Sequence, residues 1–97
     1  MRIITRKRIV EFSAIHADAG QALSEWYHTT LHCDWRNFAE MKATFGSVDA
    51  AGNDRFVFNI RGNRYRLVAI VIFAVRKVFI RFIGTHEEYN KIDCSTI

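Results

Sequence analysis

Apolar residues in the first half of the chain recur every three to four positions, which is the spacing of helices. Three helical segments are predicted on this basis, with apolar stripes over residues 9–15, 22–31 and 35–41. We expect Thr5, Asp18 and Asp34 to cap them, because such side chains accept hydrogen bonds from the free amides of a first helical turn. Residues 1–5 are apolar and β-branched, and they predict a short strand ahead of the first helix.

The second half of the chain alternates apolar and polar residues and is rich in Phe, Val and Ile, as strands are. Three antiparallel strands are predicted, over residues 55–61, 64–73 and 77–83. Gly62 and Asn63 predict a two-residue hairpin turn of type II′ between the first two strands, because glycine suits the positive φ of that turn. A second turn at Val75 and Arg76 leads into the third strand. A loop over residues 46–54 separates the strands from the helices.

Together these elements predict one α+β domain over residues 1–97. The helices of the first half cover one face of a twisted antiparallel sheet, since both kinds of element must bury an apolar face. Thr85 and Glu88 have the spacing of a capping box, so a short C-terminal helix is expected after the last strand. A chain of 97 residues leaves little room for a second domain.

The register of the hairpin sorts the strand residues into two faces. The face toward the helices is expected to hold Phe56, Phe58, Ile60, Tyr65, Leu67 and Val71. The opposite face, which we call the open face, is expected to hold Val57, Asn59, Arg61, Arg64, Arg66 and Val68. With the second turn at Val75 and Arg76, Ile70 opposes Arg81. This register predicts that Arg81 joins Arg66 on the open face.

Basic residues are concentrated in the predicted sheet. Residues 55–86 contain seven basic and no acidic residues, and six of the seven are arginines. Since the whole chain has a net charge of +4, the remainder carries −3. Arginines placed opposite one another repel, and arginine binds phosphate in a bidentate manner, so the pattern predicts an anionic partner such as a nucleic acid. Two alternatives remain open: an ordinary solvated sheet edge, or neutralisation by acidic residues of the helices or of a partner chain.

His86 is the only histidine in this basic segment, and it starts the C-terminal helix with Tyr89 three residues later. Two residues at this spacing can point from the same side of a helix, and histidine titrates near neutral pH. His28 and His32 have a spacing that could hold a metal ion, but the sequence suggests no third ligand nearby. We expect no metal and no other cofactor.

Several features indicate a cytoplasmic protein. Cys33 and Cys94 lie far apart and outside any metal-binding spacing, which predicts reduced thiols. The N-terminal residues lack the apolar core of a signal peptide. The apolar run over residues 67–73 is too short to span a bilayer, so we expect no contact with membranes.

Two segments of the chain resemble the HigB-type toxins of bacterial type II toxin–antitoxin systems. One is residues 56–69, with a Phe-Asn pair, a Gly-Asn pair and a following arginine; the other is residues 80–90, with Ile-Arg, Thr-His and Glu-Tyr pairs. The resemblance implies a fold like that of the RelE and ParE toxins. It also implies endonucleolytic cleavage of mRNA, typically on the translating ribosome. A HigA-type helix-turn-helix antitoxin is the implied partner, which binds the toxin in a hetero-oligomer.

The resemblance further implies a set of functional residues, namely Asn59, Arg61, Asn63, Arg66, Arg81, His86 and Tyr89. Another branch of toxins with the same name uses two histidines in its site, whereas here only His86 lies in the basic segment. We hypothesise that the ribose 2′-hydroxyl attacks the adjacent phosphorus without a metal ion. Such a reaction needs a base, an acid and positive charge at the phosphorus.

Each candidate has a role in this hypothesis. Arg66 and Arg81 stabilise the charge that develops at the phosphorus. His86 acts as the acid or the base, and Tyr89 positions His86 or stacks on a nucleobase. The RNA-binding residues near the hairpin tip, which hold the message or ribosomal RNA, are Asn59, Arg61, Asn63 and Arg64.

Two other functions are compatible with the same fold. A ParE-like domain inhibits a protein target such as DNA gyrase, and it needs a docking surface but no acid or base. A non-catalytic RNA-binding module uses the arginine face without chemistry, and it shows steep salt dependence with no product.

Overall fold

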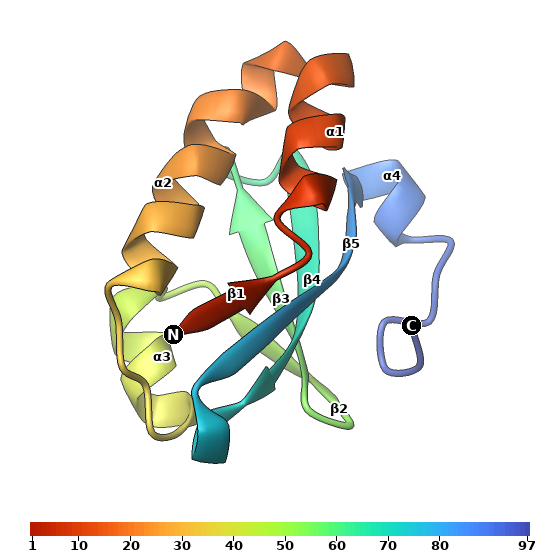
Figure 1. Cartoon of the computed structure of the whole chain (residues 1–97). Helices are drawn as coiled ribbons and strands as arrows, with labels where there is room; N and C mark the ends of the chain where they lie inside the picture. Colours follow the sequence, from red (N-terminus) through yellow and green to blue (C-terminus); the bar gives the residue numbers. More distant parts are fainter.

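A computed structural model describes all 97 residues, and a five-stranded sheet lies at its centre (Figure 1). The strands are β1 (Arg2–Ile4), β2 (Asp49–Gly52), β3 (Arg55–Ile60), β4 (Tyr65–Ile72) and β5 (Lys77–Thr85). Their order across the sheet is β1-β5-β4-β3-β2. The central strands β3, β4 and β5 form the antiparallel meander that the alternating pattern predicts. β1 runs parallel to β5, so the sheet is mixed rather than wholly antiparallel.

The helices of the first half cover one face of this sheet, which confirms the predicted α+β architecture (Figure 1). The helices are α1 (Lys7–Ile15), α2 (Gly20–Leu31), α3 (Phe38–Thr44) and α4 (His86–Tyr89). Two short 3₁₀ turns, η1 (Ala17–Ala19) and η2 (Phe73–Val75), connect α1 to α2 and β4 to β5. In Figure 1, α4 and the C-terminal segment lie on the opposite side of β5 from α1 and α2. None of the helices combines the length and the apolar composition needed to span a bilayer.

The core lies between the helices and the sheet. Leu23 and Trp26 of α2 and Met41 of α3 are buried in one cluster with Phe58 and Leu67 of the hairpin. The rings of Trp26 and Phe58 meet edge-on with their centroids 5.3 Å apart, which is a favourable aromatic geometry. All six residues assigned to the helix-facing side from the hairpin register are buried. Burial of this apolar surface, worth about 25 cal/mol per Å², is the main force that holds the helices on the sheet.

The hairpin has the predicted register, in which Asn59 pairs with Arg66. Gly62 has a φ of 65°, as expected for a glycine in this turn. Arg61 also has a positive φ, of 53°, which residues other than glycine adopt uncommonly. The turn therefore uses two residues of positive φ rather than one, and the pairing of the strands is unaffected.

The predicted register of the second turn is wrong. The 3₁₀ turn η2 lengthens the connection, and Ile70 pairs with Phe79 instead of Arg81. Further along, β5 contains a β-bulge in which Arg81 is the extra residue, between the partners of Val68 and Ala69. Both features shift the pairing by whole residues, and the alternation of apolar and polar residues does not reveal either of them.

The predicted helix starts are only partly correct. No capping hydrogen bond is made by Thr5, Asp18 or Asp34. α3 is capped instead by Asn37, whose side chain accepts a hydrogen bond from the Glu40 amide at 2.9 Å. At the start of α4, the predicted capping box between Thr85 and Glu88 is present in both directions.

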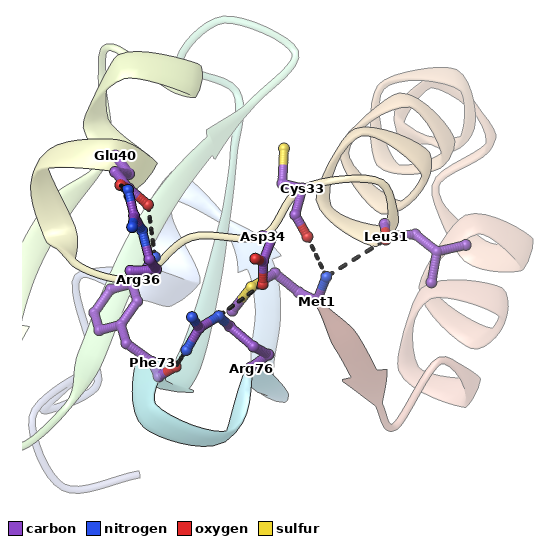
Figure 2. A network of polar contacts seen from close by, with 8 residues as sticks. All are labelled: Met1, Leu31, Cys33, Asp34, Arg36, Glu40, Phe73 and Arg76. Atoms are coloured by element: carbon purple, nitrogen blue, oxygen red, sulfur yellow. Dashed lines mark hydrogen bonds and ion pairs between the residues drawn. The ribbon is translucent and has the colours of Figure 1, made fainter.

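Asp34 takes part in a polar network that joins η2 to the end of α2 (Figure 2). Its carboxylate accepts a hydrogen bond from Arg76 Nε at 2.6 Å. The Met1 amino group donates to the carbonyls of Leu31 and Cys33 in the same region. Asp34 is not a cap because it neutralises an arginine 42 residues away, a partner that the local sequence cannot indicate.

Part of the segment predicted as a loop over residues 46–54 is strand β2, which pairs with β3. Most of its residues are exposed at the edge of the sheet. They therefore carry no apolar alternation that could predict a strand. The connection to β3 is tight and uses positive φ at Gly52, Asn53 and Asp54.

Candidate functional site

The hairpin tip and the start of α4 lie together at one end of the sheet. The His86 amide donates to the carbonyl of Arg64 at 3.2 Å, and Tyr65 pairs with Thr85 in the ladder. The pairing of β4 with β5 therefore brings basic strand residues and the candidate residues of α4 to one corner of the molecule.

Arg66 lies at the centre of this corner. It pairs with Asn59 on β3 and with Gly84 on β5. Its Nη1 donates to the carbonyl of Asn63 at 3.1 Å, and its guanidinium lies 5.6 Å from the centre of the Tyr89 ring. A cation over an aromatic ring is a favourable arrangement. The structure thus groups Arg66 with three other candidate residues.

The Tyr89 hydroxyl is held in its protonated form. It lies 3.5 Å from the sulfur of Cys94, and this hydrogen bond, together with burial, raises the pKa of Tyr89 to about 12. At neutral pH the hydroxyl therefore carries its proton, and Tyr89 can donate a hydrogen bond or stack on a ring.

The His86 ring is exposed at the first turn of α4. Its Nδ1 lies 3.3 Å from the amide nitrogen of Asn90. Asn90 therefore orients the imidazole and leaves Nε2 accessible to a ligand.

Arg81 lies at the β-bulge of β5, where it is exposed. The strand pairing does not place it opposite Arg66, which faces Gly84 three residues further along β5. Bulges redirect side chains and are common next to active sites. The structure therefore puts Arg81 on the strand that borders Arg66, at a position that register alone could not have predicted.

Arg61 and Arg64 bind a carboxylate from the helical half of the chain. Asp18 of η1 accepts hydrogen bonds from Arg61, from Arg64 at 3.4 Å and from the Tyr65 hydroxyl at 2.6 Å. These bonds, led by that of Tyr65, hold the pKa of Asp18 below its ordinary value. An acidic residue of the helices therefore neutralises part of the hairpin tip, which was one of the two alternatives open from the sequence.

His16 is a second histidine in this region that sequence reasoning missed. Its ring stacks on Phe12 with the centroids 4.5 Å apart, and it meets the ring of Tyr65 edge-on at 5.5 Å. His16 belongs to the helical half of the chain and to no motif. The available signal was its position directly after α1, four residues after Phe12 and seven after Ile9, which is the helical spacing of one face.

The C-terminal segment, residues 90–97, crosses part of the open face. Arg55 donates from Nε and Nη2 to the carbonyl of Ile97 at 3.0 and 2.7 Å. Val57 and Val68 of this face are buried. The helices α1 to α3 leave the face uncovered, as predicted, but the chain itself covers the part near the β2–β3 turn.

Comparison with known proteins agrees with the resemblance seen in the sequence. Residues 19–92 match a protein family described as HigB_toxin, RelE-like toxic component of a toxin-antitoxin system. The mRNA interferase toxin HigB of Escherichia coli (strain K12) is 30% identical over 92 residues, which cover 93% of this chain and 88% of the relative. The mRNA interferase HigB of Shigella flexneri gives the same values. That of Escherichia coli O6:H1 is 27% identical over 94 residues, covering 95% and 91% of the two chains. The chain therefore belongs to the HigB toxin family, the RelE-like toxic components of toxin–antitoxin systems.

Proposed function

We propose that this chain is an mRNA endonuclease that acts on the translating ribosome and is neutralised by a HigA-type helix-turn-helix antitoxin. The relatives support the activity, because they are named mRNA interferases. The observation that carries the proposal is the contact of Arg66 with Tyr89, on the short helix that begins with His86. It combines a phosphate-binding cation, an aromatic ring and a titratable imidazole in one corner.

The proposed reaction is metal-independent attack of a ribose 2′-hydroxyl on the adjacent phosphorus. The hydroxyl proton passes to a base, the new O–P bond closes a cyclic phosphate, and the 5′-oxygen leaves with a proton from an acid. His86 supplies or accepts one of these protons through its exposed Nε2. Tyr89 keeps its own proton, so its role is to stack on a nucleobase or to position the imidazole.

Positive charge for the pentacoordinate phosphorus comes from Arg66 and Arg81 in this proposal. Arginine suits that role because its planar fork of donors matches two phosphate oxygens at once. Arg66 is held in place by the carbonyl of Asn63 and by the Tyr89 ring. Arg81 is exposed and free to reach a bound strand from β5.

The remaining candidates hold the RNA on either side of the cleaved bond. These proposed RNA-binding residues are Asn59, Arg61, Asn63 and Arg64. Arg61 and Arg64 are exposed at the projecting hairpin tip, where a strand can approach them. Asn59 lies beside Arg66 in the ladder, where its amide can donate to a phosphate or a base.

Primer extension on a reporter mRNA in a translation extract tests the proposal. Added protein should produce new 5′ ends within the coding region, and His86→Ala and Arg81→Ala should abolish them. We expect Arg81→Ala to slow cleavage by about 10²–10³-fold, as removal of a transition-state donor does. His32→Ala and Arg2→Ala are matched controls, because both side chains are exposed and lie outside the proposed site.

Other outcomes would identify the other functions. Intact message together with altered DNA supercoiling would indicate a ParE-like inhibitor of a gyrase. Binding of RNA that falls steeply with salt and gives no product would indicate a non-catalytic module. Either result would replace the nuclease assignment. The corner of the molecule around Arg66 would then be a docking surface.

A further inference from the structure

The cluster around Asp18 has the composition of an anion-binding site. The guanidinium groups of Arg61 and Arg64 and the hydroxyl of Tyr65 all donate to a single carboxylate. The carboxylate comes from η1, 43 residues before Arg61 in the sequence. Since two cations face one anion, the cluster keeps a net positive charge.

A phosphodiester has the properties that this cluster selects. Like a carboxylate it offers two acceptor oxygens and one negative charge, and arginine binds both groups in the same bidentate way. The side chains of Arg61 and Arg64 are 47% and 63% exposed at the hairpin tip, so an RNA strand can reach them. Tyr65 is only 4% exposed, and its buried ring holds the hydroxyl as a fixed third donor.

We infer that Arg61, Arg64 and Tyr65 form a phosphodiester site for the RNA strand, and that Asp18 fills this site in the free protein and leaves when RNA binds. The identity of the ligand rests on the proposed function. The family match begins at residue 19, so Asp18 lies outside it and the inference depends on the contacts of this chain alone. In this inference the arginines bind the RNA, and Asp18 competes with the RNA for the arginines.

The exchange is physically accessible. The Asp18 side chain is 39% exposed, and exposed ion pairs contribute little stability because water screens them. RNA brings a row of phosphates, and binding of each one by an arginine releases counterions from the strand. A weakly held internal carboxylate can therefore be replaced, while it still excludes weaker anions from the hairpin tip.

The affinity for a fluorescent 2′-O-methyl RNA strand tests this inference, because the methyl groups prevent cleavage and leave binding alone. Asp18→Asn removes the competing charge and keeps an acceptor for the Tyr65 hydroxyl. We expect the strand to bind about fivefold more tightly in fluorescence anisotropy. Glu11→Gln is the matched control, because it removes one negative charge from an exposed α1 residue whose ion pair is with Lys7. It should change the affinity by less than about twofold.

A second comparison shows whether the gain in RNA affinity depends on Arg61 and Arg64. In a background of Arg61→Ala and Arg64→Ala, Asp18→Asn should give no more gain than Glu11→Gln does. Thermal unfolding establishes that each variant is folded, and Asp18→Ser replaces Asp18→Asn should the latter not fold. Asp18→Asn that binds RNA no more tightly than Glu11→Gln would overturn the inference. So would an Asp18→Asn variant that binds a purified antitoxin more tightly while its RNA affinity is unchanged.

Cleavage in the translation extract is scored separately. If the wild-type protein cuts mRNA and Asp18→Asn leaves the RNA affinity unchanged, this inference is wrong and the nuclease assignment is retained. If Asp18→Asn binds RNA more tightly and no variant cuts mRNA, the nuclease assignment is wrong and the phosphodiester site is retained.

Discussion

Tyr89, His86 and Asp18 show how single residues in the candidate site are set by their neighbours. The Cys94 sulfur and burial keep Tyr89 protonated, Asn90 orients the His86 ring, and the Tyr65 hydroxyl and two arginines keep Asp18 ionised. Each contact limits what its residue can do in a reaction. The protonation of the Tyr89 hydroxyl and the charge of the Asp18 carboxylate can therefore each be tested by substitution.

Tyr89 should act through its ring and not through its hydroxyl. Tyr89→Phe keeps the ring beneath Arg66, so we expect it to cleave mRNA within about threefold of the wild-type rate. Tyr89→Ala removes the ring and should lose about 10-fold or more, in line with the energy of a base stack. Because the pKa of Tyr89 is raised to about 12, the rate–pH profile of wild type and Tyr89→Phe should coincide near neutral pH. A large loss in Tyr89→Phe would contradict the assignment.

Asp18 should make the stability of the protein sensitive to acid. Its pKa is lowered in the folded state, chiefly by the Tyr65 hydroxyl and also by Arg61. The resulting stabilisation is complete above the ordinary aspartate pKa of 3.8 and is lost as the pH falls through the lower folded value. Urea unfolding across this range should show a weaker acid dependence in Asp18→Asn than in wild type. Glu87→Gln, at an exposed position, serves as control, and an unchanged acid dependence in Asp18→Asn would exclude this role.

Helix α4 has only four residues, and it depends on its capping box rather than on its length. Thr85 and Glu88 satisfy each other's backbone amides at 2.8 and 3.1 Å. This box fixes the turn that carries His86 and Tyr89. At the scale of elements, the geometry of the candidate site thus depends on Thr85 and Glu88, which are not among the candidate functional residues.

Thr85→Ala should therefore damage activity more than stability. Loss of the cap costs about 1 kcal/mol of unfolding free energy, because the free amide of Glu88 loses its acceptor. The first turn of α4 then frays, and cleavage should fall about 10-fold as His86 loses its position. Urea unfolding and primer extension measure the two effects. Thr85→Ser retains a hydroxyl and should behave like wild type, and an equal loss in both variants would show that the cap is not responsible.

Strand β5 has no space for a side chain at Gly84. A Cβ there would collide with the Phe82 ring and approach Glu88 Oε1 at 3.2 Å. Gly84→Ala should therefore destabilise the protein by about 1–3 kcal/mol, as overpacking does. Phe82→Ala removes the obstacle, so in that background Gly84→Ala should cost much less. Urea unfolding of the four proteins gives this comparison, and additive effects would show that the two positions do not interact.

At the scale of the whole molecule, charge is distributed unevenly between the sheet and the helices. All seven basic residues of the segment 55–86 belong to the sheet and its turns. Three of them are held by aspartates of the helical half, Arg61 and Arg64 by Asp18 and Arg76 by Asp34. Arg66 and Arg81 form no ion pair, so their charges are available to an anionic ligand.

RNA binding should consequently weaken as salt rises. The logarithm of the association constant for a single strand should fall with the logarithm of salt concentration, with a slope of about −0.7 for each phosphate neutralised. Arg66→Ala and Arg81→Ala should each make the slope shallower by about that amount. Arg2→Ala, at the opposite end of the sheet, should leave it unchanged. Identical slopes in all four proteins would place the RNA elsewhere.

Much of the fold could be predicted from the sequence because its signals are local. The helical spacing, the hairpin at Gly62 and the Thr85 capping box each depend on residues within a few positions. The predictions failed where the deciding contact is distant or carries no pattern. β2 is exposed at an edge and shows no alternation, and the bulge at Arg81 depends on how β5 meets β4.

The same division applies to the candidate site. The strand motif and α4 indicated Arg66 and Tyr89, and the structure places them in contact. Asp18 was read as a helix cap because the arginine that it binds lies 43 residues away. His16 reaches Tyr65 only through the packing of α1 on the sheet, and no spacing in the sequence encodes that approach.

The parallel pairing of β1 with β5 also sets the time at which the protein can form. β1 is the first strand to be synthesised, but its only partner in the sheet is the last strand. The ribosome delivers the chain from its N-terminus, so β1 must wait until nearly all the other elements have been made. The sheet therefore stays incomplete until β5 has been synthesised. The corner around Arg66 likewise cannot form before Tyr89 of α4 has been made, so the candidate site is completed only late in synthesis.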